Sequence, residues 1–127
     1  MRPVLVVEDE RDLRDTVAEV LECEGYHVTK AADGLEALQL ARATPPCLIL
    51  LDLMMPVMNG WQVMEALRGD RRLAATPVVI ISASHDPPPG ARGFLPKPFQ
   101  IDDLVAIVTR FAGHERHERP AAPTDRA

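Results

Sequence analysis

The chain has 127 residues, 46% of them apolar, and its 14 basic and 19 acidic side chains give a formal charge of −5. This length suits one domain, and the acidic balance argues against a protein whose main task is to hold nucleic acid or an anionic membrane. No membrane anchor or secretory signal is visible, so we expect a cytoplasmic protein. Cys23 and Cys47 lack metal-ligand spacing and are expected to be reduced and buried.

Apolar runs alternate with helical patterns from the start of the chain. Val4–Val7 is a continuous apolar run, which suits a strand buried on both faces of a parallel sheet. A helix is predicted from Arg11 to Glu24, because apolar residues recur there at helical spacing and Gly25 supplies a stop. A short second strand is predicted at Tyr26–Lys30.

The same alternation continues through the middle of the chain. Asp33 and Gly34 open a second helix, which the prolines at 45–46 close. Cys47–Leu51 is again a wholly apolar strand, and a third helix follows and ends near Gly69. The side chains expected to face the core from these two helices are Leu35, Leu38, Ala41, Val63, Met64 and Leu67.

The last third of the chain carries two more strands and a helix. Strands are predicted at Val78–Ile81 and Gly93–Leu95, and a helix at 100–112. That helix is expected to bury one face, formed by Ile101, Leu104, Val105, Val108 and Phe111. Residues 114–127 are polar and aperiodic, so we expect a domain over 1–113 followed by a disordered tail or linker stub.

Alternating strands and helices with wholly apolar strands predict an α/β fold, a parallel sheet with helices on both faces. Ligands of such sheets bind at the carboxyl ends of the strands. The polar residues that follow strands are therefore candidates for function, and they are Glu8, Asp9, Asp52, Ser82 and Lys97. Each has a bland explanation when taken alone, as a helix-dipole partner, a turn residue, a cap or a surface cation, but together they form one rim.

Three carboxylates at one rim would repel one another unless a cation joins them, and Mg²⁺ is the natural cation for oxygen ligands. A divalent ion on a carboxylate also binds phosphoryl oxygens. One carboxylate can then act as a nucleophile toward phosphorus, while Lys97 and Ser82 neutralise charge on the phosphoryl group. The rim therefore predicts formation of an aspartyl phosphate.

Four segments carry a resemblance to a known family: 4–10 (VLVVEDE), 50–60 (LLDLMMPVMNG), 80–83 (IISA) and 94–99 (FLPKPF). Over residues 3 to about 112 the chain resembles the receiver domains of response regulators in two-component signalling. The resemblance implies a flavodoxin-like, doubly wound sheet of five parallel strands in the order 2-1-3-4-5. It also implies phosphoryl transfer to the chain from a histidine kinase or a histidine phosphotransfer protein.

The resemblance implies a role for each residue that matches the phosphorylation site. Asp52 matches the phosphoacceptor and Asp9 a direct Mg²⁺ ligand, with Glu8 acting through a metal-bound water. Met54 would offer its backbone carbonyl to the metal, and Lys97 matches the lysine that pairs with the acceptor carboxylate and then with the phosphoryl group.

The same resemblance implies how the signal spreads. Ser82 matches a switch hydroxyl, Ala83 a residue whose backbone amide approaches the phosphoryl group, and Phe94 an aromatic switch, although a core phenylalanine is an equally plain reading. The resemblance also implies a cis peptide bond between Lys97 and Pro98. Pro56 and Gly60 complete the motif that begins at Asp52.

The sequence departs from the family pattern between Ser82 and Phe94. Only residues 83–93 stand there, and they include three of the twelve prolines, Pro87–Pro89. We therefore expect the helix usual at this place to be missing or reduced to a turn. Its loss should uncover apolar side chains of 78–81, leaving a groove for a partner, a second copy of the chain or the tail.

Three functions remain open at this point. The leading hypothesis is a phosphorylatable receiver that is not an enzyme and that acts through protein contacts, or as a phosphoryl relay or sink, without nucleic acid or membrane. The alternative is an adaptor on the same scaffold that signals without phosphorylation, which the missing helix favours. A phosphohydrolase with an aspartate nucleophile is disfavoured, because Met54 occupies the position where such enzymes place a second aspartate.

Overall fold

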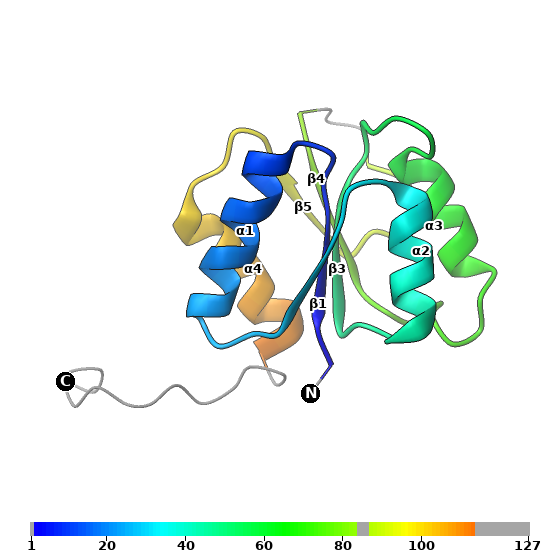
Figure 1. Ribbon diagram of the computed structural model, residues 1–127, viewed down its shortest axis with the longest axis horizontal. Coiled ribbons are helices and arrows are strands. Elements are labelled where there is room, and N and C mark those ends of the chain that lie inside the picture. The colour runs from blue at the N-terminus through cyan, green and yellow to red at the C-terminus, as the bar shows by residue number, and fades with distance from the viewer. Residues whose placement is uncertain (1, 84–86, 114–127) are drawn as a thin grey trace.

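The computed structural model describes residues 2–83 and 87–113, so the expected tail at 114–127 lies outside the described residues. Its five strands form one parallel sheet in the order β2-β1-β3-β4-β5. Helices α1 and α4 cover one face of the sheet, and α2 and α3 cover the other (Figure 1). This architecture confirms the predicted fold class. The elements in chain order are β1 Val4–Val7, α1 Arg11–Cys23, β2 Val28–Ala31, α2 Gly34–Ala43, β3 Leu48–Asp52, α3 Gly60–Arg68, β4 Val78–Ser82, β5 Gly93–Pro96 and α4 Ile101–Ala112.

The strands place their carboxyl ends at one edge of the sheet. The register pairs Val7 of β1 with Leu51 of β3, and Ser82, the last residue of β4, with Pro96 of β5. Residues that follow β1 and β5 therefore lie level with the last residues of β3 and β4. This carboxyl edge is where the sequence predicted the functional residues to meet.

Alternating strand residues feed two cores, one on each face of the sheet. Leu5 and Val7 pack in the cluster on the α2 and α3 side, whereas Val4 and Val6 pack in the cluster on the α1 and α4 side. All four residues of β1 are at most 1% exposed. Burial on both faces explains why the central strands read as unbroken apolar runs.

The connection from β4 to β5 contains no helix in its described residues, 83 and 87–92, as the sequence predicted. The prediction of an exposed apolar groove, however, is wrong, because each residue of Val78–Ile81 is at most 5% exposed. On the α3 side, Leu67 and Leu73 share a core cluster with Val78 and Ile80, and the half-buried Ala91 packs against it. The chain's own side chains thus cover the strip that a partner was expected to cover.

Three further expectations about burial are wrong. Leu35 is 50% exposed and Ile101 is 55% exposed, because they lie in the first turns of α2 and α4, where the helices begin beside the carboxyl edge. Cys23 is exposed at the last residue of α1, although Cys47 is buried as expected. Among the described helices, none combines the length and apolar character needed to cross a membrane.

Candidate functional site

Three carboxylates meet at the carboxyl edge of the sheet. Glu8 and Asp9 directly follow β1, and Asp52 is the last residue of β3. One oxygen from each lies within 4.8 Å of the others. Glu8 and Asp52 are only 5% and 4% exposed, whereas Asp9 is open to solvent. Two buried acids and one exposed acid thus converge, as the chain order and the sheet topology predicted.

Lys97 brings a positive charge to these acids. Its Nζ lies 2.8 Å from Oε1 of Glu8 and 3.4 Å from Oδ2 of Asp52. Its backbone N–H donates to the carbonyl of Ser82 at 3.0 Å, which fixes the start of the segment after β5 against the end of β4. The Lys97–Pro98 peptide bond is cis.

Burial and charge act in opposite directions on this ion pair. Burial raises the pKa of Glu8, helped by the nearby charge of Asp52, and outweighs the hydrogen bond from Lys97 that lowers it. Burial alone would lower the pKa of Lys97, but the hydrogen bond and charge of Glu8, together with Asp52, raise that pKa above its ordinary value. The site thus favours the protonated form of Lys97, and it also favours the protonated form of Glu8 more than water does.

Backbone groups hold the carboxylates in place. The N–H of Met54 donates to Oδ1 of Asp52 at 3.2 Å, and the N–H of Glu10 donates to Oε2 of Glu8 at 3.1 Å. Arg14 on α1 donates from Nη1 to the carbonyl oxygens of Glu8 at 2.9 Å and of Asp9 at 3.5 Å. The sequence analysis missed Arg14, because a contact with a main-chain carbonyl leaves no sequence pattern beyond a helix position facing the loop.

The residues predicted to act as switches lie on β4, directly after it and on β5. Ser82 is fully buried at the end of β4, and Ala83, the next residue, is exposed. Phe94 of β5 is half-buried and packs against the core cluster on the α3 side. Its strand partner is Ile80, two residues before Ser82.

The loop from Asp52 to α3 is built for close approach. A Cβ on Gly60, the first residue of α3, would lie 2.7 Å from Cα of Leu53 and 2.9 Å from the carbonyl oxygen of Asp52. Because a backbone atom cannot move aside easily, Gly60 lets α3 begin directly against the end of β3. Pro56 is exposed in the same loop.

Two features at the helix starts were missed by the sequence analysis. Asn59 and Gln62 form a reciprocal capping box at the start of α3, with hydrogen bonds of 3.0 Å and 2.9 Å. A Cβ on Gly34, the first residue of α2, would lie 2.6 Å from Cγ2 of Val63. The capping pair was visible in the sequence as N-x-x-Q, whereas the contact of Gly34 required the packing of α2 on α3.

The donor set fits a hard divalent cation. Carboxylate oxygens are the ligands that Mg²⁺ prefers, together with retained waters, and the exposed Asp9 leaves one side of the cluster open. Asp9, Asp52 and Glu8 would hold such an ion, and Nζ of Lys97 lies beside Glu8 and Asp52. A bound cation and the ammonium of Lys97 could therefore together stabilise the negative charge of a group such as a phosphoryl group.

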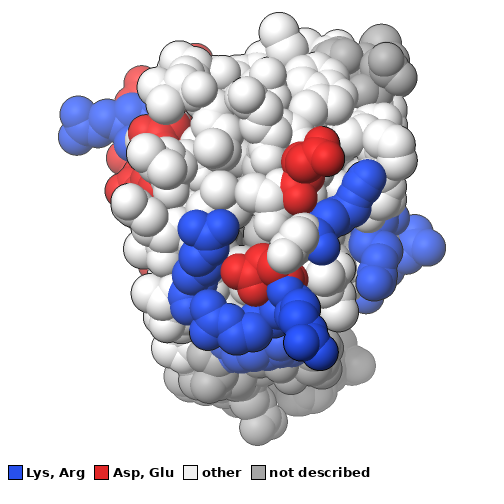
Figure 2. Space-filling model, turned by 90° about the vertical axis from the view of Figure 1, so that its right-hand side faces the viewer, with Lys and Arg blue, Asp and Glu red and all other residues white. Residues whose placement is uncertain are grey.

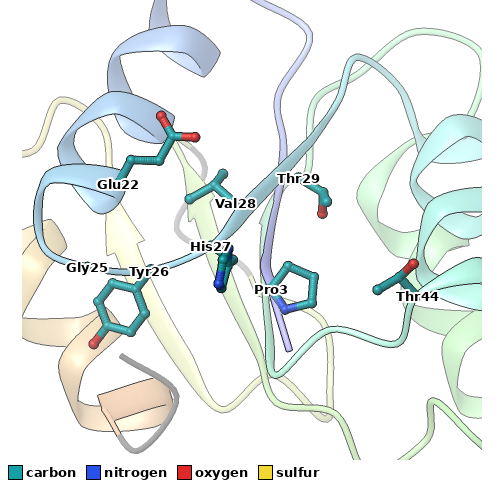
Figure 3. A pocket seen from close by; sticks show the side chains of 8 residues that line it. All are labelled: Pro3, Glu22, Gly25, Tyr26, His27, Val28, Thr29 and Thr44. Atoms are coloured by element: carbon teal, nitrogen blue, oxygen red, sulfur yellow. The ribbon is translucent and has the colours of Figure 1, made fainter. Parts of the chain in front are cut away.

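Two pockets of the molecule differ in whether predicted site residues line them. A pocket of about 450 Å³ includes Lys97 in its lining, together with Leu13, Thr16, Ala83, Pro98, Phe99 and Ile101. A pocket of about 580 Å³ lies near the amino ends of β1 and β2, where its lining includes Pro3, Glu22 and Tyr26 (Figure 3). The second pocket contains none of the predicted site residues, so the candidate chemistry belongs to the carboxyl edge.

Comparisons with known proteins identify the family of the chain. The family model described as "Response regulator receiver domain" matches residues 4–109. The chemotaxis protein CheY4 of Vibrio cholerae has a similar structure, with a TM-score of 0.81 and 34% identity, covering 87% of this chain and 98% of that chain.

Curated relatives are longer than this chain. The DNA-binding dual master transcriptional regulator RpaA of Synechocystis is 36% identical over 115 residues, which cover 85% of this chain and 48% of RpaA. The DNA-binding response regulator MtrA of Mycobacterium tuberculosis is 38% identical over 112 residues, covering 83% of this chain and 48% of MtrA. The chain thus spans about half the length of these relatives. From β1 into α4 it carries the family's pattern on the family's fold, and it belongs to the receiver domains of response regulators.

Proposed function

We propose that this receiver domain accepts a phosphoryl group on Asp52 from a histidine kinase or a histidine phosphotransfer protein. The observation that carries the proposal is the arrangement at the carboxyl edge, where Asp52 lies with Glu8 and Asp9 on one side and Nζ of Lys97 at 3.4 Å. Membership of the receiver family supports it, because such domains serve two-component signalling.

In the proposed transfer, a carboxylate oxygen of Asp52 forms a bond to phosphorus. The bond between phosphorus and the donor's histidine nitrogen breaks, and that nitrogen keeps the electron pair and takes up a proton. Mg²⁺, held by Asp9, Asp52 and the backbone carbonyl of Met54, with Glu8 acting through water, would neutralise charge on the phosphoryl oxygens. Hydrolysis by water later restores the carboxylate and releases inorganic phosphate.

The residues around Asp52 would then report the added charge. Lys97 is proposed to move from the carboxylates toward the phosphoryl oxygens, and the hydroxyl of Ser82 and the backbone N–H of Ala83 to donate to them. Phe94 is proposed to change its packing as Ser82 moves, since both lie beside Ile80 and Ile81 at the end of β4. A local charge change would thereby bias two arrangements of the β4 and β5 edge.

The output of the domain is proposed to be a protein contact made in the cytoplasm. RpaA and MtrA are named as DNA-binding proteins, but the shared region covers only 48% of each. An adaptor that works without phosphorylation is the second candidate, and the observation that favours it is the lack of a helix in the described residues between β4 and β5, 83 and 87–92. Such an adaptor would keep the fold and leave Asp52 unmodified.

Intact mass spectrometry separates these two functions. The full chain is incubated with Mg²⁺ and acetyl phosphate, or with phosphoramidate, and the expected product carries one added phosphoryl group. Asp52→Asn should abolish the adduct, whereas Asp103→Asn, which changes an exposed acid on α4, should leave it unchanged. Absence of any adduct with both donors would reject the phosphoacceptor and support the adaptor.

A further inference from the structure

The outer faces of α2 and α3 repeat one pattern. In α2, the exposed Leu35 is followed seven residues later by the exposed Arg42, and in α3 Trp61 is followed seven residues later by Arg68. Seven residues are close to two helical turns, so each pair lies on one side of its helix, roughly 10 Å apart. The two helices lie side by side and start at the same edge of the sheet (Figure 1).

The arginine ends of these stripes form an ordered group. Asp70, which follows α3, accepts from Nε of Arg42 at 3.4 Å and from the backbone N–H of Arg72 at 3.0 Å. Nη2 of Arg72 in turn donates to the carbonyl of Arg42 at 3.2 Å. Because these contacts already restrict two guanidinium groups, less side-chain entropy would be lost when the group binds a partner.

The arginine group is positive although the chain is acidic. Arg42, Arg68, Arg71 and Arg72 carry four positive charges against two negative charges on Glu65 and Asp70, which leaves +2 in a chain of −5. On this side of the molecule the Lys and Arg side chains gather mainly in the lower half (Figure 2). Capping of the helix C-termini explains Arg42 and Arg68 singly, but Arg71 and Arg72 lie beyond the helix.

The other ends of the stripes expose large apolar side chains. Leu35 is 50% exposed, Trp61 38% and Val57, in the loop before α3, 81%. The helix starts touch, because a Cβ on Gly34 would lie only 2.6 Å from Val63 of α3. Tryptophan and arginine are the residue types that most often dominate the energy of protein interfaces.

From these observations we propose that the outer face of α2 and α3 docks an acidic amphipathic helix of a partner protein. The surface consists of Leu35, Val57 and Trp61 at one end and Arg42, Arg68 and Arg72 at the other. The partner places apolar side chains on the first end and carboxylates, about two turns away, on the guanidinium groups, which bind carboxylates through paired hydrogen bonds. This proposal does not depend on phosphorylation of Asp52.

Charge and spacing favour this occupant over two others. A nucleic acid carries phosphates along its whole length, so it would leave the exposed side chains of Leu35 and Val57 without an apolar partner. A second copy is disfavoured within the described ranges, 2–83 and 87–113, because its exposed Ile101 lies directly beside Asp102 and Asp103 rather than two turns from them. These points favour a helix of another protein as the occupant.

Fluorescence of Trp61, the single tryptophan of the chain, provides the test. The probe is a synthetic helical peptide of about 15 residues, roughly 22 Å long, with leucines in its first turn and glutamates two turns later. We expect a blue shift of the emission on binding. Arg42→Glu with Arg68→Glu should weaken binding at least about tenfold, whereas Arg110→Glu, on α4, should not change it.

Further measurements complete the design. A peptide with lysines in place of the glutamates should not bind. Leu35→Ser should weaken binding of the acidic peptide, although it changes no arginine. Circular dichroism checks that each variant is folded, and phosphorylation by acetyl phosphate should be unaffected by the two arginine changes. That last readout separates failure of this proposal from failure of the phosphoacceptor role.

Five outcomes would overturn the proposal. Three of them are no binding of the acidic peptide at millimolar concentration, equal binding of the lysine peptide, and binding that survives the double arginine change. Tighter binding of a single-stranded oligonucleotide than of the peptide would assign the surface to nucleic acid. Dimerisation seen by light scattering, if lost in Arg42→Glu with Arg68→Glu, would assign it to a second copy and equally reject a partner helix.

Discussion

At the scale of single residues, the site depends on how one ammonium is shared between two buried carboxylates. Nζ of Lys97 lies closer to Glu8, at 2.8 Å, than to Asp52, at 3.4 Å. Glu8 therefore holds the lysine beside Asp52 without neutralising Asp52 fully. In the proposed transfer this leaves the acceptor carboxylate available while a cation for the incoming phosphoryl group is already in place.

Replacement of Lys97 by methionine tests this sharing. Lys97→Met keeps a long side chain but removes the charge, so Mg²⁺ affinity should stay the same or increase, since one cation no longer competes for the acids. The rate of phosphorylation by acetyl phosphate should fall roughly 100-fold, the usual cost of losing one charge-stabilising donor. Calorimetry gives the affinity and intact mass the rate. An unchanged rate would remove Lys97 from the mechanism, and Arg110→Met serves as the control for a distant cation.

The raised pKa of Glu8 predicts how stability depends on pH. Burial raises this pKa above 4.5, so the folded chain binds the proton of Glu8 more tightly than the unfolded chain does. Without metal, the free energy of unfolding should therefore decrease as the pH rises from 4.5 through the raised pKa. Glu8→Gln should remove this decrease in urea unfolding measured across the pH range. The exposed Glu19→Gln should keep it, and a wild-type-like slope in Glu8→Gln would contradict the assignment.

At the scale of elements, the loop between β3 and α3 combines tight fit with strain. Gly60 and the Asn59–Gln62 capping box fix the start of α3 against Leu53. Val57, in contrast, adopts φ of +69°, a left-handed conformation that β-branched residues rarely occupy. The loop thus carries backbone strain within five residues of Asp52, where such strain is often associated with function.

Substitutions at Val57 should reveal this strain. Asn tolerates the left-handed region better than Val, and the 81% exposed side chain buries little surface. Val57→Asn should therefore raise the free energy of unfolding by about 1 kcal/mol. Val57→Ala, which lacks the β-branch but keeps Cβ, should raise it less. Urea unfolding measures both changes, and equal values for the two variants would show that φ is not the cause.

The elements also show what the sequence could and could not predict. Apolar runs predicted β1, β3 and β4, an alternating pattern predicted β2, and β5 was expected as a short strand. Asp52 and Lys97 were found because charged residues end or follow these strands. Leu35 and Ile101 were expected inside, but helical periodicity does not show that a first turn extends past the sheet. Leu73 is buried in a turn after α3. A single buried residue in a turn has no periodic sequence pattern by which it could be predicted.

At the scale of the whole molecule, the two ends of the parallel sheet differ in charge. The carboxyl edge gathers Glu8, Asp9 and Asp52, whereas the arginine group lies where α2 and α3 end, at the opposite edge. Parallel strands cause this separation, because every helix starts at one edge and ends at the other. The proposed cation site and the proposed docking surface would therefore not compete for the same edge of the domain.

Binding of Mg²⁺ at the acidic edge should stabilise the entire fold. A ligand that binds only the folded chain, at about 100 times its dissociation constant, adds about 2.7 kcal/mol to the free energy of unfolding. Asp52→Asn should lose most of this gain, while Asp103→Asn should keep it. Urea unfolding with Mg²⁺ and with a chelator measures the difference. An equal gain in Asp52→Asn would place the bound cation elsewhere on the protein.

The short edge strand β5 links these scales in one further way. It pairs only with β4, ends at Pro96 and is followed at once by Lys97. Transient opening of β5 should move the ammonium of Lys97 away from Glu8 and Asp52. A group that binds Lys97 more firmly should make this opening rarer. Amide hydrogen exchange along β5 should then be slower. If Asp52 is phosphorylated as proposed, its phosphorylation state would be readable as a protection factor of β5, even where no helix shifts.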